Sequence, residues 1–88
     1  MTNMTPLADL IESRMQALGL CKEALGQRLG YKNPAKAAGR VYALCDGRRF
    51  SAKSRFALWL LPEALNLPAC VVFEAVAATE RMLDEWEL

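Results

Sequence analysis

The stretch LCKEALGQRLGYKNPAKAAGRVYALCDG, residues 20–47, decides how this chain folds. Its apolar residues recur at helical spacing on both sides of Gly30, which predicts two short helices joined by a tight turn. The first helix is expected over about 21–29. Asn33 and Pro34 then open the second, which runs to about 45, because Asn caps free N–H groups and Pro lacks the one that would stay unpaired.

Another helix is expected before this pair. The apolar spacing predicts a helix over about 6–18, and Gly19 ends it because glycine adopts the left-handed backbone of a helix end at little cost. Inside the helix at 21–29, Gly26 costs about 1 kcal/mol relative to Ala. That cost indicates a close crossing by the helix at 34–45.

A fourth helix is expected over about 51–61, with Ser51 or Ser54 at its start. Phe56 and Trp59 are predicted to lie in its core-facing stripe. Pro62 interrupts the apolar pattern, and it is expected to break the helix and leave 62–65 as a separate turn.

The last helix is expected from Pro68 to about Glu85, and residues 68–88 form the C-terminal segment of a single domain, 1–88. No alternation of period two indicates a strand, so the predicted fold is all-α, a compact domain of five helices. One apolar stripe of this helix is long for so small a domain. It is interpreted either as core packing or as a dimerisation seam formed by Val72, Val76, Leu83 and Trp86.

The charges are distributed unevenly along the chain. The net charge is only +1. Residues 22–55, however, carry nine cations against two acids, a net charge of +7, while residues 1–21 and 56–88 have net charges of −1 and −5. This segregation of charge indicates a basic surface formed by the middle of the chain.

Cys21, Cys45 and Cys70 are an odd number of thiols without CxxC spacing, and the chain has no His. A disulfide framework or a metal site is therefore not expected, and the thiols are interpreted as small buried hydrophobes in a reducing cytoplasm. No apolar run is long enough to span a membrane. The chain is not expected to be an enzyme, because no His is present and Ser51 and Ser54 have no nearby base.

Residues 20–31 resemble the opening of the lambda-repressor-like (Cro-type) helix-turn-helix domains. Those domains read leucine, serine, two polar residues, leucine, alanine, two polar residues, leucine, glycine and a hydrophobe. Residues 60–67 resemble the closing helix of the same family, with Asn66 in the place of a glycine.

The resemblance covers about residues 7–72 and implies a compact all-α, lambda-repressor-like domain with a helix-turn-helix. It also implies that the helix at 34–45 enters the major groove of DNA and that Lys22 meets a phosphate. The chain departs from the family pattern at Cys21, where Ser or Thr is usual. It also has about five additional residues between 31 and 47, which lengthen either the second helix or the turn.

Lys32, Lys36 and Arg40 follow one another at intervals of four residues, so they are expected to line one exposed helix face. No acid occurs between Lys32 and Cys45. The three cations span about 12 Å of helix, comparable to the ~12 Å width of the major groove. Contact with nucleic acid is the leading interpretation, and a solvated basic face is the alternative.

Lys36 and Arg40 are expected to reach guanine edges or phosphates, and Asn33 to pair with adenine. Arg48 and Arg49 are expected to contact phosphates. The complete set of candidate DNA-binding residues is Lys22, Arg28, Lys32, Asn33, Lys36, Arg40, Arg48 and Arg49.

These patterns predict a small cytoplasmic DNA-binding regulator of transcription, of bacterial or phage type, whose partner is double-stranded DNA. A homodimer would suit the pairing of helix-turn-helix units on half-sites. No cofactor, metal, membrane or small-molecule substrate is expected. Two alternatives are a protein-interaction module that binds an acidic partner through the basic face, and an accessory subunit that works through its last helix.

Overall fold

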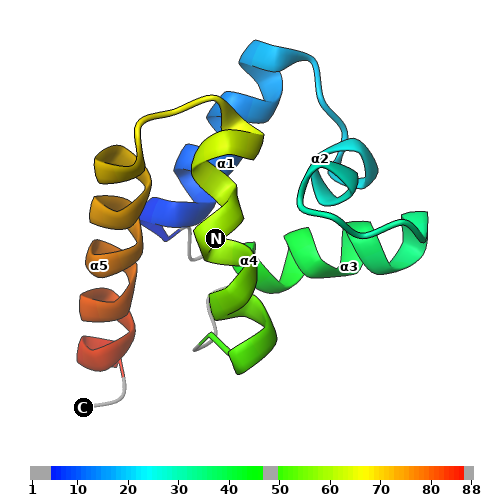
Figure 1. The fold of residues 1–88 in the computed structure, drawn as a ribbon. Helices are drawn as coiled ribbons and strands as arrows, with labels where there is room; N and C mark the ends of the chain where they lie inside the picture. The colour runs from blue at the N-terminus through cyan, green and yellow to red at the C-terminus, as the bar shows by residue number, and fades with distance from the viewer. Residues whose placement is uncertain (1–4, 47–49, 87–88) are drawn as a thin grey trace.

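A computed structural model of the chain describes residues 5–46 and 50–86, and these form five α-helices and no strand (Figure 1). The helices are α1 Pro6–Leu18, α2 Lys22–Arg28, α3 Pro34–Cys45, α4 Ala52–Leu65 and α5 Ala69–Trp86. The prediction of an all-α fold with five helices is confirmed. No helix in this described part has the length and apolar content needed to cross a bilayer.

The helix ends follow the signals in the sequence. The side chains of Thr5, Asn33 and Ser51 each accept hydrogen bonds from N–H groups in the first turns of α1, α3 and α4. Gly19 ends α1 and Asn66 ends α4, both with left-handed backbone at φ 68° and 55°. The predicted starts of α1, α3 and α4 and the predicted stop of α1 are therefore confirmed, whereas α4 extends beyond its predicted end at Leu61.

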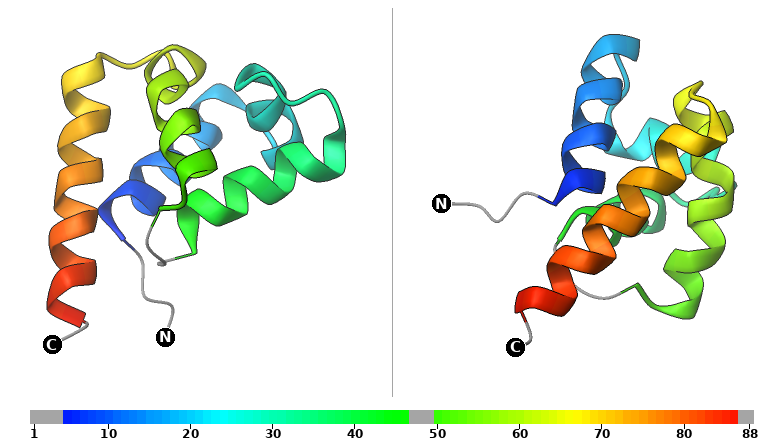
Figure 2. Two further views of the ribbon diagram at one scale, coloured as in Figure 1. Left: turned by 60° about the horizontal axis from the view of Figure 1, so that its bottom comes forward. Right: turned by 90° about the vertical axis from the view of Figure 1, so that its left-hand side faces the viewer.

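The core lies where α1 and α4 meet the other three helices. Both lie between α5 on one side and the α2–α3 pair on the other, as Figures 1 and 2 show. Each of the five helices contributes apolar side chains to one cluster. Its largest fully buried members are Leu7, Ile11, Leu25, Val41, Leu44, Leu61, Leu65 and Val72.

Helices α2 and α3 form the most extensive helix pair in the described chain. Their backbones approach so closely at Gly26 that a Cβ added there would collide with the backbone carbonyl of Ala37. The predicted packing role of Gly26 is confirmed. Gly39 is different, since a Cβ added there would meet no described atom within 4 Å.

The prediction that Phe56 and Trp59 lie in the core is wrong. Their side chains are 67% and 73% exposed. A helix offers the core only one stripe, and α4 fills its own with smaller residues one turn apart. The buried residues of α4 are Ser54, Ala57, Leu58, Leu61, Ala64 and Leu65.

The predicted break at Pro62 is also wrong, because α4 continues through it to Leu65. Pro62 lies in the last turn of the helix, where only one hydrogen bond is lost to its missing N–H. The N–H groups of Asn66 and Leu67 bond to the carbonyls of Glu63 and Pro62 at 3.1 and 2.9 Å, which closes the helix end.

The apolar stripe of α5 packs inside the chain. Val72 and Leu83 are buried where α5 lies along α1, so these two residues are not available as a dimerisation seam. Val76 is half-buried against the core, and Trp86 is 46% exposed at the end of the helix. The core interpretation of the stripe therefore holds for Val72 and Leu83, and the seam prediction is corrected at these two residues.

One buried hydrogen bond joins the first turn of α1 to α5. The backbone N–H of Leu7 donates to Thr79 Oγ1 at 2.9 Å, and the same hydroxyl donates to the Ala75 carbonyl at 2.8 Å. The first N–H groups of a helix have no partner within the helix. Thr79 therefore satisfies a donor that would otherwise be buried without a bond.

Gly26→Ala should lower the free energy of unfolding by about 1–3 kcal/mol, because the added methyl overpacks a contact with rigid backbone. The matched control is Gly39→Ala, which should raise it by about 0.4–1 kcal/mol by restricting the unfolded chain. Urea denaturation measures both. Equal effects of the two substitutions would contradict the close crossing of α2 and α3.

Thr79→Val should lower the free energy of unfolding by about 1–3 kcal/mol, since it leaves the buried Leu7 N–H without an acceptor. Hydrogen exchange of the Leu7 amide should become faster in this variant. Thr79→Ser keeps the hydroxyl and should preserve the protection of that amide. Unchanged exchange in Thr79→Val would show that another group accepts the bond.

Candidate nucleic-acid interface

The turn between α2 and α3 directs the basic side chains that follow it. The N–H of Gly30 bonds to the Gln27 carbonyl at 3.0 Å, and the N–H of Tyr31 bonds to the Gly26 carbonyl at 3.2 Å. Gly30 has φ 101°, a backbone conformation that glycine adopts without strain. The turn is thus held by backbone bonds, and it positions the start of α3 relative to α2.

Lys32 and Lys36 flank the first turn of α3, and both are exposed as predicted. Between them, Asn33 Oδ1 accepts bonds from the N–H groups of Ala35 and Lys36 at 2.9 and 3.3 Å. This cap uses the side-chain oxygen that pairing with adenine would require. Asn33 therefore stabilises the helix start, and the two lysines are the accessible cations there.

Arg40 does not share the exposure of the two lysines, which corrects its prediction as an outward residue. Its side chain is half-buried, and Nη1 donates to Ser54 Oγ of α4 at 3.1 Å. The guanidinium carbon also lies 5.8 Å from the centre of the Tyr31 ring. Four residues turn a helix by about 400°, so residues at intervals of four shift by about 40° around the helix axis at each step. This shift places Arg40 against α4, while Lys36 stays exposed.

The buried part of the Arg40 side chain does not make all the hydrogen bonds it could. Its Nε is buried and has no hydrogen-bond partner among the residues that the structure describes. Ser54, which receives the Nη1 bond, is itself buried and also bonds to Ser51 at 3.3 Å. Arg40 thus connects α3 with the first turn of α4.

Two other predicted cations also have partners within the chain. Lys22 Nζ lies 4.9 Å from the centre of the Tyr42 ring of α3. Arg28 Nη1 donates to the backbone carbonyl of Ala64 in α4 at 3.1 Å. Both side chains link α2 to a neighbouring helix. Arg48 and Arg49 lie outside the described residues.

The outward face of α3 is lined by small residues and one aromatic residue. Ala35, Gly39 and Tyr42 are exposed on it, and Tyr42 is 60% exposed. Tyr42 is not among the residues predicted to contact DNA. Its place seven residues after Ala35 and three after Gly39 puts it on the same helix face, and that spacing was the available signal.

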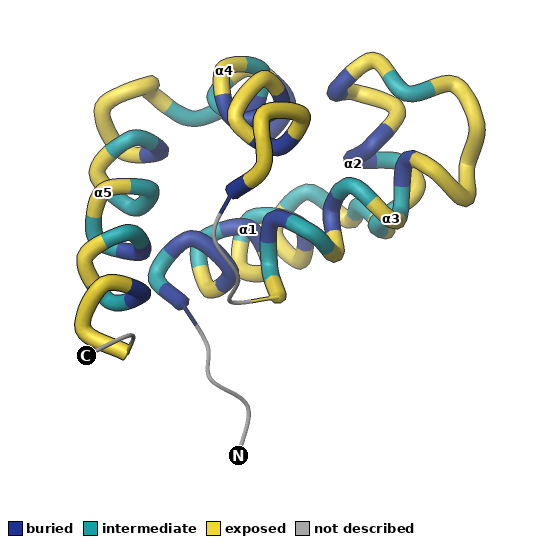
Figure 3. The backbone as a smooth tube through the Cα atoms, turned by 90° about the horizontal axis from the view of Figure 1, so that it is seen from below, coloured by how far each residue is buried: buried dark blue, intermediate teal, exposed yellow. Residues whose placement is uncertain are grey.

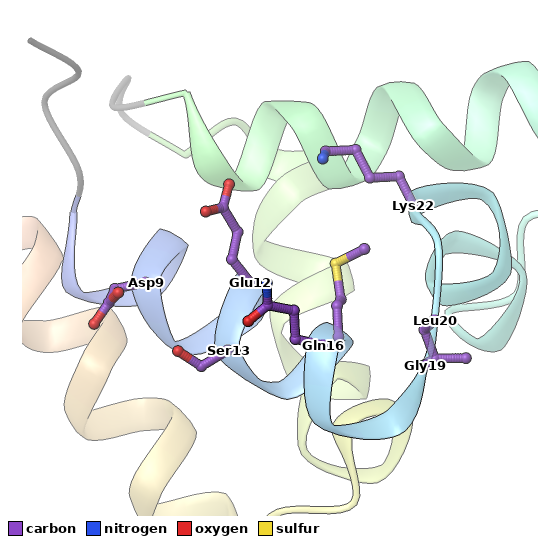
Figure 4. Close-up of a pocket in the computed structure, with 8 residues that line it drawn as sticks. Asp9, Glu12, Ser13, Gln16, Gly19, Leu20 and Lys22 are labelled. Atoms are coloured by element: carbon purple, nitrogen blue, oxygen red, sulfur yellow. The ribbon is translucent and has the colours of Figure 1, made fainter.

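A groove of about 490 Å³ lies between α1 and the start of α2, beside α3 (Figure 4). Glu12 and Lys22 extend toward α3 from opposite sides of it. Its lining residues are Asp9, Glu12, Ser13, Met15, Gln16, Gly19, Leu20 and Lys22. With two carboxylates and one ammonium group, this groove does not attract phosphate, and it is separate from the exposed lysines of α3.

The three cysteines differ in their surroundings. Cys21 and Cys70 are exposed, so the prediction that they are buried is wrong, whereas Cys45 is half-buried. Burial raises the pKa of Cys45 to about 11, and the Glu12 carboxylate adds to this effect. Cys45 is therefore a protonated thiol at neutral pH, a weak nucleophile and a weak metal ligand.

Comparisons with protein-family models, with curated proteins and with solved structures find no match to this chain. Within residues 5–46 and 50–86, no group of three or more His, Cys, Asp or Glu side chains could hold a metal ion.

Arg40→Ala should lower the free energy of unfolding by about 1–3 kcal/mol, because it removes a part-buried charged hydrogen bond and the packing of the aliphatic stem. Lys36→Ala introduces the same residue into the same helix at an exposed position. Lys36→Ala should change the free energy of unfolding by less than about 0.5 kcal/mol. If chemical denaturation shows that Lys36→Ala destabilises the fold as much as Arg40→Ala, then Arg40 does not stabilise the packing of α3 against α4 as described.

Proposed function

We propose that this chain is a small DNA-binding protein that acts in transcription regulation and places the start of α3 in the major groove of double-stranded DNA. The observation that carries the proposal is the exposure of Lys32 and Lys36 at the first turn of α3. The N-terminus of a helix has a partial positive charge, and phosphate groups bind there readily. The two ammonium groups add to this potential, and no acid follows them before Asp46.

The shape of α3 supports the same proposal. An α-helix fits the major groove, which is about 12 Å wide. Ala35 and Gly39 are small and exposed, so the helix backbone can approach the floor of the groove. In this arrangement Lys36 reaches guanine edges or phosphates from the side of the helix, and Lys32 contacts the DNA backbone.

The other predicted DNA-binding cations that the structure describes contact neighbouring helices. Arg28 and Arg40 bind groups of α4, and Lys22 lies over Tyr42, so these three hold α2 and α3 in place. A rigid helix loses little conformational entropy when it binds. We therefore assign to Arg40 the positioning of α3, and the contacts with DNA to Lys32 and Lys36.

The distribution of acids is consistent with this orientation. Most acids of the second half of the chain belong to α5, which lies on the far side of the molecule from α2 and α3 (Figure 1). DNA bound at α3 would be kept away from those carboxylates. Repulsion between DNA phosphates and the carboxylates of α5 then favours binding at α3 over binding at α5.

Titration with duplex DNA at two or more salt concentrations tests the proposal. With two to four phosphate contacts per protomer, log K should fall against log salt with a slope of about −2 to −4. Lys36→Glu should weaken binding about tenfold or more and reduce the magnitude of the slope by about one.

The matched control is Arg81→Glu, which makes the same change of net charge at an exposed position of α5. It should alter affinity much less than Lys36→Glu does. Absence of binding at low salt, or equal losses in the two variants, would rule out α3 as the interface.

A further inference from the structure

Helix α4 carries a second apolar surface on the side away from the core. Phe56 and Trp59, three residues apart, are two-thirds and almost three-quarters exposed. Together with Ala52, Leu60 and Glu63 they form what we call the α4 outer face. Large aromatic side chains that stay in water lose the stabilisation that their burial would provide, so adjacent ones mark a contact surface.

The position of Trp59 on this face is fixed before any partner binds. Its ring meets the ring of Phe73 from α5 edge to face, with 5.4 Å between the centroids and 69° between the planes. A shallow groove of about 200 Å³ continues from this pair between α4 and α5. Arg55, Leu58 and Val76 complete the lining of that groove.

The two halves of α4 carry opposite charges, so two antiparallel copies of this helix would pair positive with negative side chains. Lys53 and Arg55 are exposed in the N-terminal half, and Glu63 is exposed in the C-terminal half. Arg55 Nη1 lies 3.5 Å from Oε1 of Glu80 in α5. Both side chains of that pair are substantially exposed, so the pair is weak and leaves Arg55 available to another carboxylate.

We propose that the α4 outer face binds the same face of a second copy of this chain, with the two α4 helices antiparallel. A two-fold axis between residues 56 and 59 then places Phe56 of each copy against Trp59 of the other. Residues 52, 56, 59 and 63 are separated by four, three and four positions, the spacing of a helix–helix seam.

The antiparallel arrangement also pairs opposite charges. Glu63 of each copy lies near the N-terminus of the other α4, where Lys53, Arg55 and the helix dipole attract a carboxylate. A parallel arrangement would place like charges together at both ends. Phosphate-rich nucleic acid is a less suitable occupant of this face, because Glu63 and Glu80 would repel it.

The size of the face predicts a reversible dimer. The exposed parts of two aromatic side chains supply on the order of 200–350 Å² per protomer, given that such side chains bury about 150–250 Å² each. A standard interface buries about 800 Å² per partner. The rest must come from Leu60, Ala52 and the α5 groove, so association should depend on protein concentration.

The dimer is independent of DNA binding. Helix α4 forms one edge of the molecule, and α1 and α3 lie together along the opposite edge (Figure 3). Sedimentation velocity of the chain without DNA should therefore show a monomer–dimer equilibrium, whatever the outcome of the DNA titration.

Phe56→Ser should raise the dissociation constant of the dimer about tenfold or more, because one aromatic contact is lost at each of two symmetric positions. Trp86→Ser removes another exposed aromatic residue, at the end of α5, and should leave the dimer intact. Circular dichroism of both variants checks that the fold is retained, as the exposure of both residues predicts.

Charge reversal tests the antiparallel arrangement with variants that keep the aromatic residues. Glu63→Lys alone, and Lys53→Glu combined with Arg55→Glu, should each weaken self-association. Mixed in equal amounts, the two variants should form a heterodimer, since both ends of the seam then pair opposite charges.

A monomer at all concentrations would overturn the proposal, as would a dimer that Phe56→Ser leaves unchanged. Failure of the two charge variants to associate more strongly with each other than with themselves would also overturn it. Quenching of Trp59 fluorescence by single-stranded oligonucleotides, observed on a monomeric chain, would show that the face stacks on bases instead.

Discussion

The close approach of α2 and α3 at Gly26 and Ala37 is the contact on which the basic end of the molecule depends. Helix α2 has only seven residues, too few to be stable alone, so it forms because it packs against α3. The crossing is close because one residue lacks a Cβ. It sets the direction of α3 and, with it, the places where Lys32, Lys36 and Arg40 emerge.

The basic side chains of α2, α3 and the turn between them lie in two kinds of surroundings. Lys22 contacts Tyr42 and so joins α2 to α3, while Arg28 and Arg40 hold this pair of helices against α4. Lys32 and Lys36 are exposed at a helix N-terminus. A count of cations treats all five alike, whereas their surroundings separate those that support the scaffold from those that can meet phosphate.

Helix α4 has two apolar faces, of which one is buried and the other is exposed. The inner face is buried in the core, and the outer face carries Phe56 and Trp59 into solvent. In the proposed antiparallel dimer these residues would be covered, and two α3 helices would be related by a two-fold axis. Paired recognition helices read symmetric half-sites on DNA. The two proposals are thus compatible, although neither requires the other.

The sequence by itself determined the elements of this fold. Caps at Thr5, Asn33 and Ser51 and the end at Gly19 are local properties, because they depend on bonds or on steric freedom within a few residues. The close contact at Gly26 is made with Ala37 of another helix, and the sequence indicated it only through the cost of a glycine inside a helix. Tertiary structure alone decided which face of each helix is covered. Helical spacing identifies an apolar stripe, but α4 and α5 each carry more apolar residues than one stripe can bury. The contacts among helices therefore selected Val72 and Leu83 for the core and left Phe56 and Trp59 outside it. The same contacts brought Arg40 against Ser54, fourteen residues away, a partner that no pattern along the chain indicates.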